Sequence, residues 1–117
     1  MSKYALLALA TLGLAGVAMA QGMPKPTTLV DRPNATGGEK LYVEKCAMCH
    51  APNGMGFGLL ARRGKEPNLE KRGDLKKPYI TLAVRTGIGN MPALPRGEVS
   101  DEQLAAIADY LAAGPHS

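Results

Sequence analysis

Cys46-Ala47-Met48-Cys49-His50 is the segment that decides the fold of this 117-residue chain. It holds both cysteines of the chain, two residues apart, followed directly by one of its two histidines. A cysteine pair at this spacing is found in covalent haem attachment sites, in thioredoxin-like redox pairs and in zinc sites, and it can also close a short disulfide loop. The rest of the sequence discriminates among these four.

The full pattern C-x-x-C-H is the attachment signature of c-type haem. Two thiols at this separation can add to the two vinyl groups on one side of a porphyrin, and the next residue then projects its imidazole beneath the iron. We therefore expect one haem c, bound covalently through Cys46 and Cys49, with His50 as the proximal iron ligand. The covalent bonds would retain the cofactor through reversible redox change.

The three competing sites fit the sequence less well. A thioredoxin-like pair needs a strand before its helix, and no segment alternates apolar and polar residues as a strand does. A zinc site needs four ligands, but the second histidine of the chain, His116, is next to last. A disulfide across so short a loop gains little chain entropy, although a disulfide-bonded module without haem stays open as an alternative.

The sixth iron ligand must come from outside this segment, and the candidates are Met48, Met55, Met91 and His116. Met48 lies inside the attachment segment, and Met55 follows His50 by only five residues, hardly enough chain to reach the far face of the ring. His116 is expected in a mobile tail. Met91 lies forty-one residues beyond His50 in a segment rich in glycine and proline, and it is the expected distal ligand.

Histidine and methionine together fill both axial positions of the iron. The thioether favours ferrous iron and raises the reduction potential, and a filled sixth position leaves no place for dioxygen or peroxide. The sequence therefore predicts a carrier of single electrons and not an enzyme. The alternative, an open-site haem enzyme or gas sensor, requires that Met91 does not bind the iron.

Further residues are expected to support the haem without binding its iron. The Nδ1–H of His50 needs an acceptor that fixes the ring, and the backbone carbonyls of residues 56–60 are the expected source. The haem propionates need hydrogen-bond donors. The candidates for that role are Tyr79, Arg85, and Arg62 or Arg63.

The apolar periodicity predicts an all-α fold of three to four helices, with long loops wrapped around one haem. Residues 51–75 show no period and are expected to be irregular. The expected helix boundaries are a capping box at Thr36 and Glu39 for the first helix, Pro78 and Gly87 for the second, and a capping box at Ser100 and Gln103 followed by Gly114-Pro115 for the last.

The first twenty residues have the pattern of an export signal. Lys3 supplies the positive charge, residues 5–17 form an apolar run, and Ala18-Met19-Ala20 is a small-x-small cleavage site. The run is shorter than the roughly 20 residues that span a bilayer. We therefore expect cleavage after Ala20, a periplasmic location and no stable membrane anchor. The expected organisation is a signal peptide at residues 1–20, an extended arm at 21–35, the haem domain at 36–114 and a tail at 115–117.

The charge of the chain gives no indication of a nucleic-acid partner. Removal of residues 1–20 leaves thirteen Lys and Arg against ten Asp and Glu, a small excess that two haem propionates would nearly neutralise. Aromatic and basic residues do not alternate, as a single-strand binding surface would require. Residues 62–77 are locally basic, with seven cations against three acids, and either steer docking onto an acidic partner or form a solvated loop.

Residues 38–112 resemble the small bacterial class I c-type cytochromes. The shared residues are Gly38, Tyr42, Cys46-x-x-Cys49-His50, Gly56-x-Gly58, Met91-Pro92 and Ile107-x-x-Tyr110-Leu111. The resemblance implies that the first and last helices cross, with Gly38 at the close approach and Tyr42 packed against Ile107, Tyr110 or Leu111. It also implies Met91 as the distal ligand.

The resemblance has one departure. The family usually has a proline after the second loop glycine, and the carbonyl of that proline accepts the hydrogen bond from the ligand histidine. This chain has Leu59 there, so the Leu59 carbonyl is the expected acceptor from His50.

Four shorter segments are similar to the cytochrome subunits of 4-cresol dehydrogenase-type flavocytochromes and related dehydrogenase-linked cytochromes. They are Pro78-Tyr79-Ile80, Val84-Arg85-x-Gly87, Met91-Pro92-Ala93-x-Pro95 and Val99-Ser100-Asp101-Glu102. This similarity implies a periplasmic, flavin-dependent dehydrogenase as electron donor, with electrons passed on toward the respiratory chain. A free carrier and a tightly bound subunit both stay open.

Overall fold

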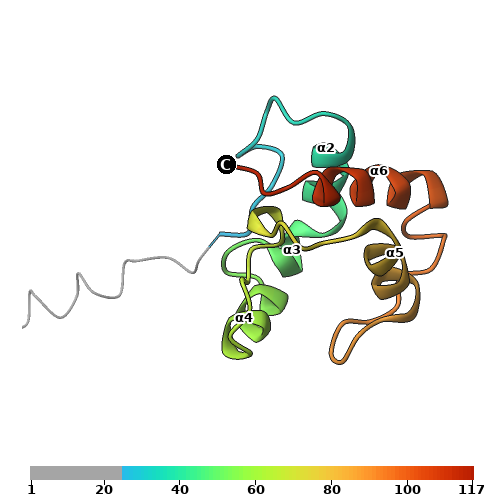
Figure 1. Ribbon diagram of the computed structural model, residues 1–117. Helices are drawn as coiled ribbons and strands as arrows, with labels where there is room; N and C mark the ends of the chain where they lie inside the picture. Colours follow the sequence, from blue (N-terminus) through green and yellow to red (C-terminus); the bar gives the residue numbers. More distant parts are fainter. Residues whose placement is uncertain (1–24) are drawn as a thin grey trace, which may run out of the picture.

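The structure, a computed structural model, describes residues 25–117, so the expected export signal lies outside the described residues. Within this range the chain forms five α-helices and one 3₁₀ turn, and no strand longer than an isolated bridge. None of these helices is long and apolar enough to cross a membrane. In chain order (Figure 1) the elements are α2 (Gly37–Lys45), α3 (Ala47–His50), α4 (Met55–Arg62), η2 (Leu69–Lys71), α5 (Lys77–Thr86) and α6 (Asp101–Ala112).

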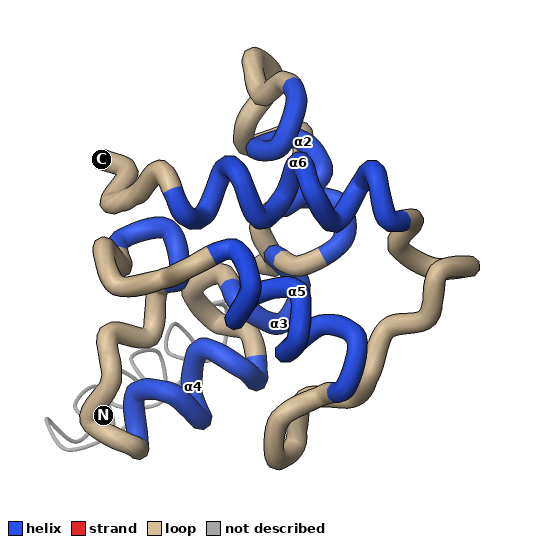
Figure 2. Tube along the Cα trace, turned by 45° about the vertical axis from the view of Figure 1, so that its right-hand side comes forward, coloured by secondary structure: helices blue, strands red, loops and turns tan. Residues whose placement is uncertain are grey.

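The crossing of α2 and α6 organises the fold, and Figures 1 and 2 both show the two helices in contact at the top of the molecule. Gly38 makes the close approach possible, because a Cβ atom there would overlap the Ala106 carbonyl and lie 2.7 Å from the Cβ of Tyr110. Tyr42 is fully buried, with its ring centroid 5.9 Å from that of Tyr110. Both expectations for this crossing are confirmed.

The helix ends follow the sequence signals at α5 and α6 but not at α2. The backbone N–H of Gln103 donates to Ser100 Oγ (3.1 Å), and that of Ser100 donates to Gln103 Oε1 (3.0 Å), which completes the predicted capping box. Pro78 lies in the first turn of α5, and Gly87 ends that helix with φ of 74°. Thr36 stands at the N-cap of α2, but its side chain makes no capping hydrogen bond, so that predicted box is wrong.

The expectation of an irregular segment over residues 51–75 was wrong, because this segment contains α4 and η2. Gly56 and Gly58 each disfavour a helix by about 0.5–1 kcal/mol relative to alanine, and they interrupt the apolar pattern that would have indicated one. Phe57, Leu59 and Leu60 of α4 are nevertheless half-buried. Packing of these side chains outweighs the low local propensity, and residues 25–117 form five α-helices where three to four were expected.

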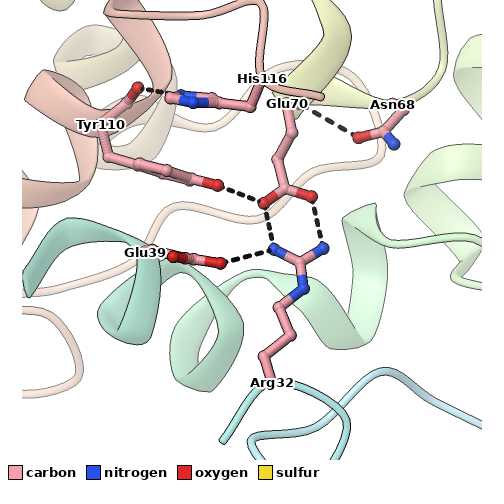
Figure 3. Close-up of polar contacts among 6 residues, drawn as sticks. All are labelled: Arg32, Glu39, Asn68, Glu70, Tyr110 and His116. Atoms are coloured by element: carbon pink, nitrogen blue, oxygen red, sulfur yellow. Dashed lines mark hydrogen bonds and ion pairs between the residues drawn. The ribbon is translucent and has the colours of Figure 1, made fainter. Parts of the chain in front are cut away.

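A polar cluster around Glu70 ties together three segments that lie far apart in the chain (Figure 3). Glu70 is 5% exposed, and its carboxylate accepts two hydrogen bonds from the Arg32 guanidinium, at 2.5 and 2.7 Å. The Tyr110 hydroxyl donates a third, at 2.6 Å. The arm before α2 is thereby fastened to η2 and to α6.

The C-terminal residues join the same cluster, which contradicts the expected mobile tail. The backbone N–H of His116 donates to the Glu70 carbonyl (2.7 Å). Its ring stacks on that of Tyr110 with centroids 4.2 Å apart, and its Nε2 lies 2.7 Å from the Tyr110 carbonyl oxygen. The Glu70 carboxylate therefore holds the arm before α2, while the Glu70 backbone carbonyl and the Tyr110 ring hold the C-terminal residues.

The cluster keeps Glu70 ionised. Burial by itself would raise the pKa of Glu70, but the hydrogen bonds from Arg32 and Tyr110 outweigh it, and the pKa falls below the ordinary value of 4.5. The hydrogen bond with Glu70 raises the pKa of Arg32, and burial followed by the Glu70 hydrogen bond raises that of Tyr110. Near neutral pH, Glu70 therefore stays ionised while Arg32 and Tyr110 stay protonated, which are the forms that make these hydrogen bonds.

We predict that Glu70→Gln destabilises the haem-loaded protein at pH 7 by about 1–3 kcal/mol, because the half-buried Arg32 guanidinium loses its buried charged partner. The pKa of Glu70 is lower in the folded protein than in the unfolded chain, so its ionised form stabilises the fold at pH values above the unfolded-state pKa. This contribution is lost as the pH falls through the pKa of Glu70 in the folded protein. Arg32, Tyr110 and His116 are the groups that act on Glu70, and Glu39 accepts a further hydrogen bond from Arg32. Urea unfolding of wild type and variant should therefore converge only as the pH falls below the lowered pKa of Glu70. A difference that is independent of pH would contradict the ionised cluster.

Candidate functional site

A cavity of about 540 Å³ lies between α3 and α4 on one side and α5 with its following loop on the other. Its size falls within the range of about 300–1,000 Å³ typical of cofactor pockets. In Figure 1, α4 and the loop after α5 are the two lower arms of the molecule, and both contribute to its walls. Apolar side chains dominate the lining, among them Leu59, Leu75, Ile80, Val84, Ile107 and Leu111.

The attachment segment forms one wall of this cavity. Cys46 ends α2, and its carbonyl accepts hydrogen bonds from the backbone N–H groups of Cys49 (3.1 Å) and His50 (3.0 Å). This tight turn brings Cys46, Cys49 and His50 together on the cavity wall. Both cysteines are free thiols, so the structure does not contain the alternative disulfide. Burial raises the pKa of the Cys46 thiol to about 11.

The immediate surroundings of His50 differ from the expectation. Burial lowers the pKa of His50, which favours the neutral imidazole that can bind a metal. Its Nδ1 is buried and has no hydrogen-bond partner among the described residues. The expected acceptors, the carbonyls of residues 56–60 with that of Leu59 among them, lie within α4 and do not bond to it. Leu59 instead contributes its side chain to the cavity lining.

Gly56 supports His50 in a way that the sequence analysis missed. A Cβ atom on Gly56 would lie 3.2 Å from Cε1 and 3.3 Å from Nδ1 of the His50 ring, and 2.9 Å from the Cys49 carbonyl oxygen. The imidazole therefore packs directly against the backbone of α4. The signal in the sequence was a glycine six residues after the histidine, but nothing local showed that its missing side chain makes room for the ring.

We predict that Gly56→Ala moves the imidazole and lowers the yield of haem-loaded protein, and that it shifts the reduction potential of what does load. Gly58→Ala is the matched control, because it lies in the same helix and a Cβ atom there would meet nothing within 4 Å. Potentiometric titration and the absorbance ratio of haem to protein are the measurements. Equal behaviour of the two variants would show that Gly56 does not restrain His50.

Met91 lines the same cavity from the loop between α5 and α6. Its backbone pairs with that of Ile88 in both directions, at 2.9 and 3.1 Å. Gly87 adopts φ of 74°, and a Cβ atom there would lie 2.6 Å from the Met91 carbonyl oxygen. The fold thus brings His50 and Met91, forty-one residues apart, to one apolar chamber.

The expected propionate donors are only partly in place. Tyr79 and Arg63 line the cavity, and Arg72, which the sequence analysis did not single out, lines it too. Arg62 and Arg85 are not among the lining residues. Arg85 is a correction, because its guanidinium donates instead to the Leu94 carbonyl and to Asp101.

Comparison with known proteins decides which kind of site this is. A family model described as "Cytochrome C oxidase, cbb3-type, subunit III" matches residues 33–111. The chain belongs to the cytochrome c family. Seventy-eight residues of this cytochrome are 41% identical to the cytochrome c subunit of 4-cresol dehydrogenase [hydroxylating] from Pseudomonas putida, and cover 67% of this chain and 60% of that one.

Two further comparisons agree with that assignment. Cytochrome c6 from Anabaena variabilis is 31% identical over 78 residues, which are 67% of this cytochrome and 88% of that protein. A crystal structure of p-cresol methylhydroxylase with substrate bound contains a chain of 40% identity. It superposes with a TM-score of 0.52 over 68% of this cytochrome and 93% of that chain. The all-α fold and the dehydrogenase-linked likeness are thus confirmed.

The described residues fit the cofactor of the family. Two free thiols and a neutral imidazole face a largely apolar cavity of suitable size, and the missing side chain of Gly56 leaves room for the imidazole. The cytochrome therefore binds one haem c covalently, with Cys46 and Cys49 as the residues of the attachment motif. When bound, this group would supply an iron that takes up and releases one electron, which is the chemistry expected of a cytochrome.

Proposed function

We propose that His50 and Met91 are the two axial ligands of the haem iron, and that this pair tunes the cytochrome for outer-sphere electron transfer. The observation that carries the proposal is that both side chains line one cavity although they come from separate segments of the fold. A thioether ligand raises the reduction potential. With both positions filled, the iron changes its surroundings little between oxidation states and offers no site for substrates.

The other methionines near the site support this choice. Met48 is 76% exposed and does not line the cavity. Met55 lines it, but it is 73% exposed and stands at the first position of α4. Met91 is less exposed than either and is held by backbone hydrogen bonds on a loop that glycines shape.

We predict that Met91→Ala in the haem-loaded protein abolishes the weak far-red absorption band that a methionine–ferric iron bond gives, and lowers the reduction potential. Met55→Ala is the matched control, since it removes the other methionine of the cavity and should keep both properties. If Met91→Ala leaves the band and the potential unchanged, Met91 is not the ligand. Another methionine is then bound, whereas a wild-type protein that lacks the band would favour the open-site enzyme or sensor.

The electron donor is the second part of the proposal. We infer a periplasmic dehydrogenase, flavin-dependent by analogy with the Pseudomonas putida relative, and a respiratory acceptor beyond it. The support is the likeness to the cytochrome subunit of a dehydrogenase in both sequence and structure. The proposed periplasmic location is supported by the export-signal pattern of residues 1–20 and by haem c attachment, which takes place outside the bacterial cytoplasm.

The basic stretch at residues 62–77 supports docking onto an acidic partner. Among the described residues, Arg72 pairs with Asp74 and Lys77 with Asp109. Five other cations of the stretch form no ion pair with any described residue, so their charge faces the solvent. They are Arg62, Arg63, Lys65, Lys71 and Lys76. Arg63 also lines the cavity, which places part of this charge beside the redox centre.

We predict that the cytochrome, purified from its native periplasm at low ionic strength, elutes with a flavin-containing dehydrogenase that reduces it. The rate of reduction should fall as salt is added, because the basic stretch steers the encounter. Elution as a lone monomer with a salt-independent rate would contradict a dedicated acidic partner. Persistence of the complex at high salt would identify a tightly bound subunit instead of a free carrier.

A further inference from the structure

The loop that carries Met91 is held to α5 through the backbone of Leu94. The Leu94 N–H donates to the carbonyl of Val84, one residue before Arg85 in α5, at 2.8 Å. The carbonyl of the same Leu94 accepts from Arg85 Nη1, at 2.9 Å. Val84 and Arg85 of α5 thus bond to both backbone polar groups of Leu94, which lies three positions after Met91.

Arg85 also connects this loop to the last helix. Its Nη2 donates to Asp101 Oδ1 at 2.8 Å, and Asp101 is the first residue of α6. The Arg85 side chain is 15% exposed, and its Nε is buried without a partner. A buried N–H without a partner costs free energy, which the two Nη hydrogen bonds offset. One guanidinium therefore joins α5, the middle of the Met91 loop and the start of α6.

The neighbouring arginine does not share this role. Arg96 donates through Nε to the second oxygen of Asp101, at 2.8 Å, but its side chain is 72% exposed. It makes no hydrogen bond to the loop backbone among the described residues. The two arginines thus share a carboxylate while only Arg85 reaches the loop, which makes Arg96 a matched control.

We propose that Arg85 is a positioning residue for Met91. It restrains the loop so that the thioether stays directed at the iron and external ligands cannot displace it. This inference rests on the proposed ligation by Met91. Arg85 does not touch the iron or the thioether, and it acts through Leu94 and the backbone between Leu94 and Met91.

The test is competition by added imidazole for the ferric iron of the haem-loaded protein. Arg85→Met keeps a long side chain but removes both hydrogen bonds. Loss of a charged hydrogen bond that holds the loop should lower the apparent dissociation constant of imidazole by about tenfold. Arg85→Lys retains the charge with a single ammonium group and should give an intermediate value. Arg96→Met should bind imidazole as the wild type does.

The outcomes separate this inference from the ligation itself. If the wild type shows the methionine–iron band and both Arg85 variants bind imidazole with wild-type affinity, Arg85 does not position Met91, although Met91 still ligates. If the wild type lacks the band, the ligation fails and this inference fails with it. A role in stability alone would lower the unfolding midpoint without changing imidazole affinity, and that result also overturns the proposal. If Arg85→Met does not fold, the imidazole affinities of Arg85→Lys and Arg96→Met are compared instead. Equal affinities would overturn the proposal.

Discussion

The close crossing of α2 and α6 at Gly38 is the contact on which the rest of the structure depends. It fixes the position in space of the C-terminal end of α2, and the attachment segment follows that end directly in the chain. Because Ile107 and Leu111 of α6 also line the cavity, the same contact sets the haem-bearing segment opposite an apolar wall. Any side chain at position 38 would push the two helices apart and alter both at once.

The composition of the domain explains why a cavity can lie at its centre. The chain has no tryptophan and one phenylalanine, and aromatic side chains contribute the largest buried areas. The buried residues are mostly aliphatic and small, and many of them pack around the cavity instead of filling it. A flat, apolar cofactor completes this core, so haem binding and folding are parts of one process.

Polar contacts hold in place the loops and chain ends that the apolar core does not restrain. The Glu70 cluster fastens the N-terminal arm and the C-terminal residues on one side of the α2–α6 crossing (Figure 3). The Arg85 contacts restrain the Met91 loop at the other end of α6. Each uses one charged group to join segments that are separated along the chain. The loops of this small protein are thereby held in place without a larger core.

The resemblance to the class I c-type cytochromes implied the pairing of Gly38 and Tyr42 with the last helix. The amino-acid sequence by itself determined the attachment motif, the all-α class and the capping box of α6. Each of these features depends on the spacing of residues that are close in the chain, or on a motif that occurs in few kinds of site. Only the tertiary structure decided that glycine-rich residues 55–62 form a helix, that Gly56 makes room for His50, and that Arg85 reaches Leu94. The same holds for Glu70, which bonds to Arg32, thirty-eight residues away. Each of these depends on a partner distant in the chain, and local propensity and spacing carry no information about such a partner.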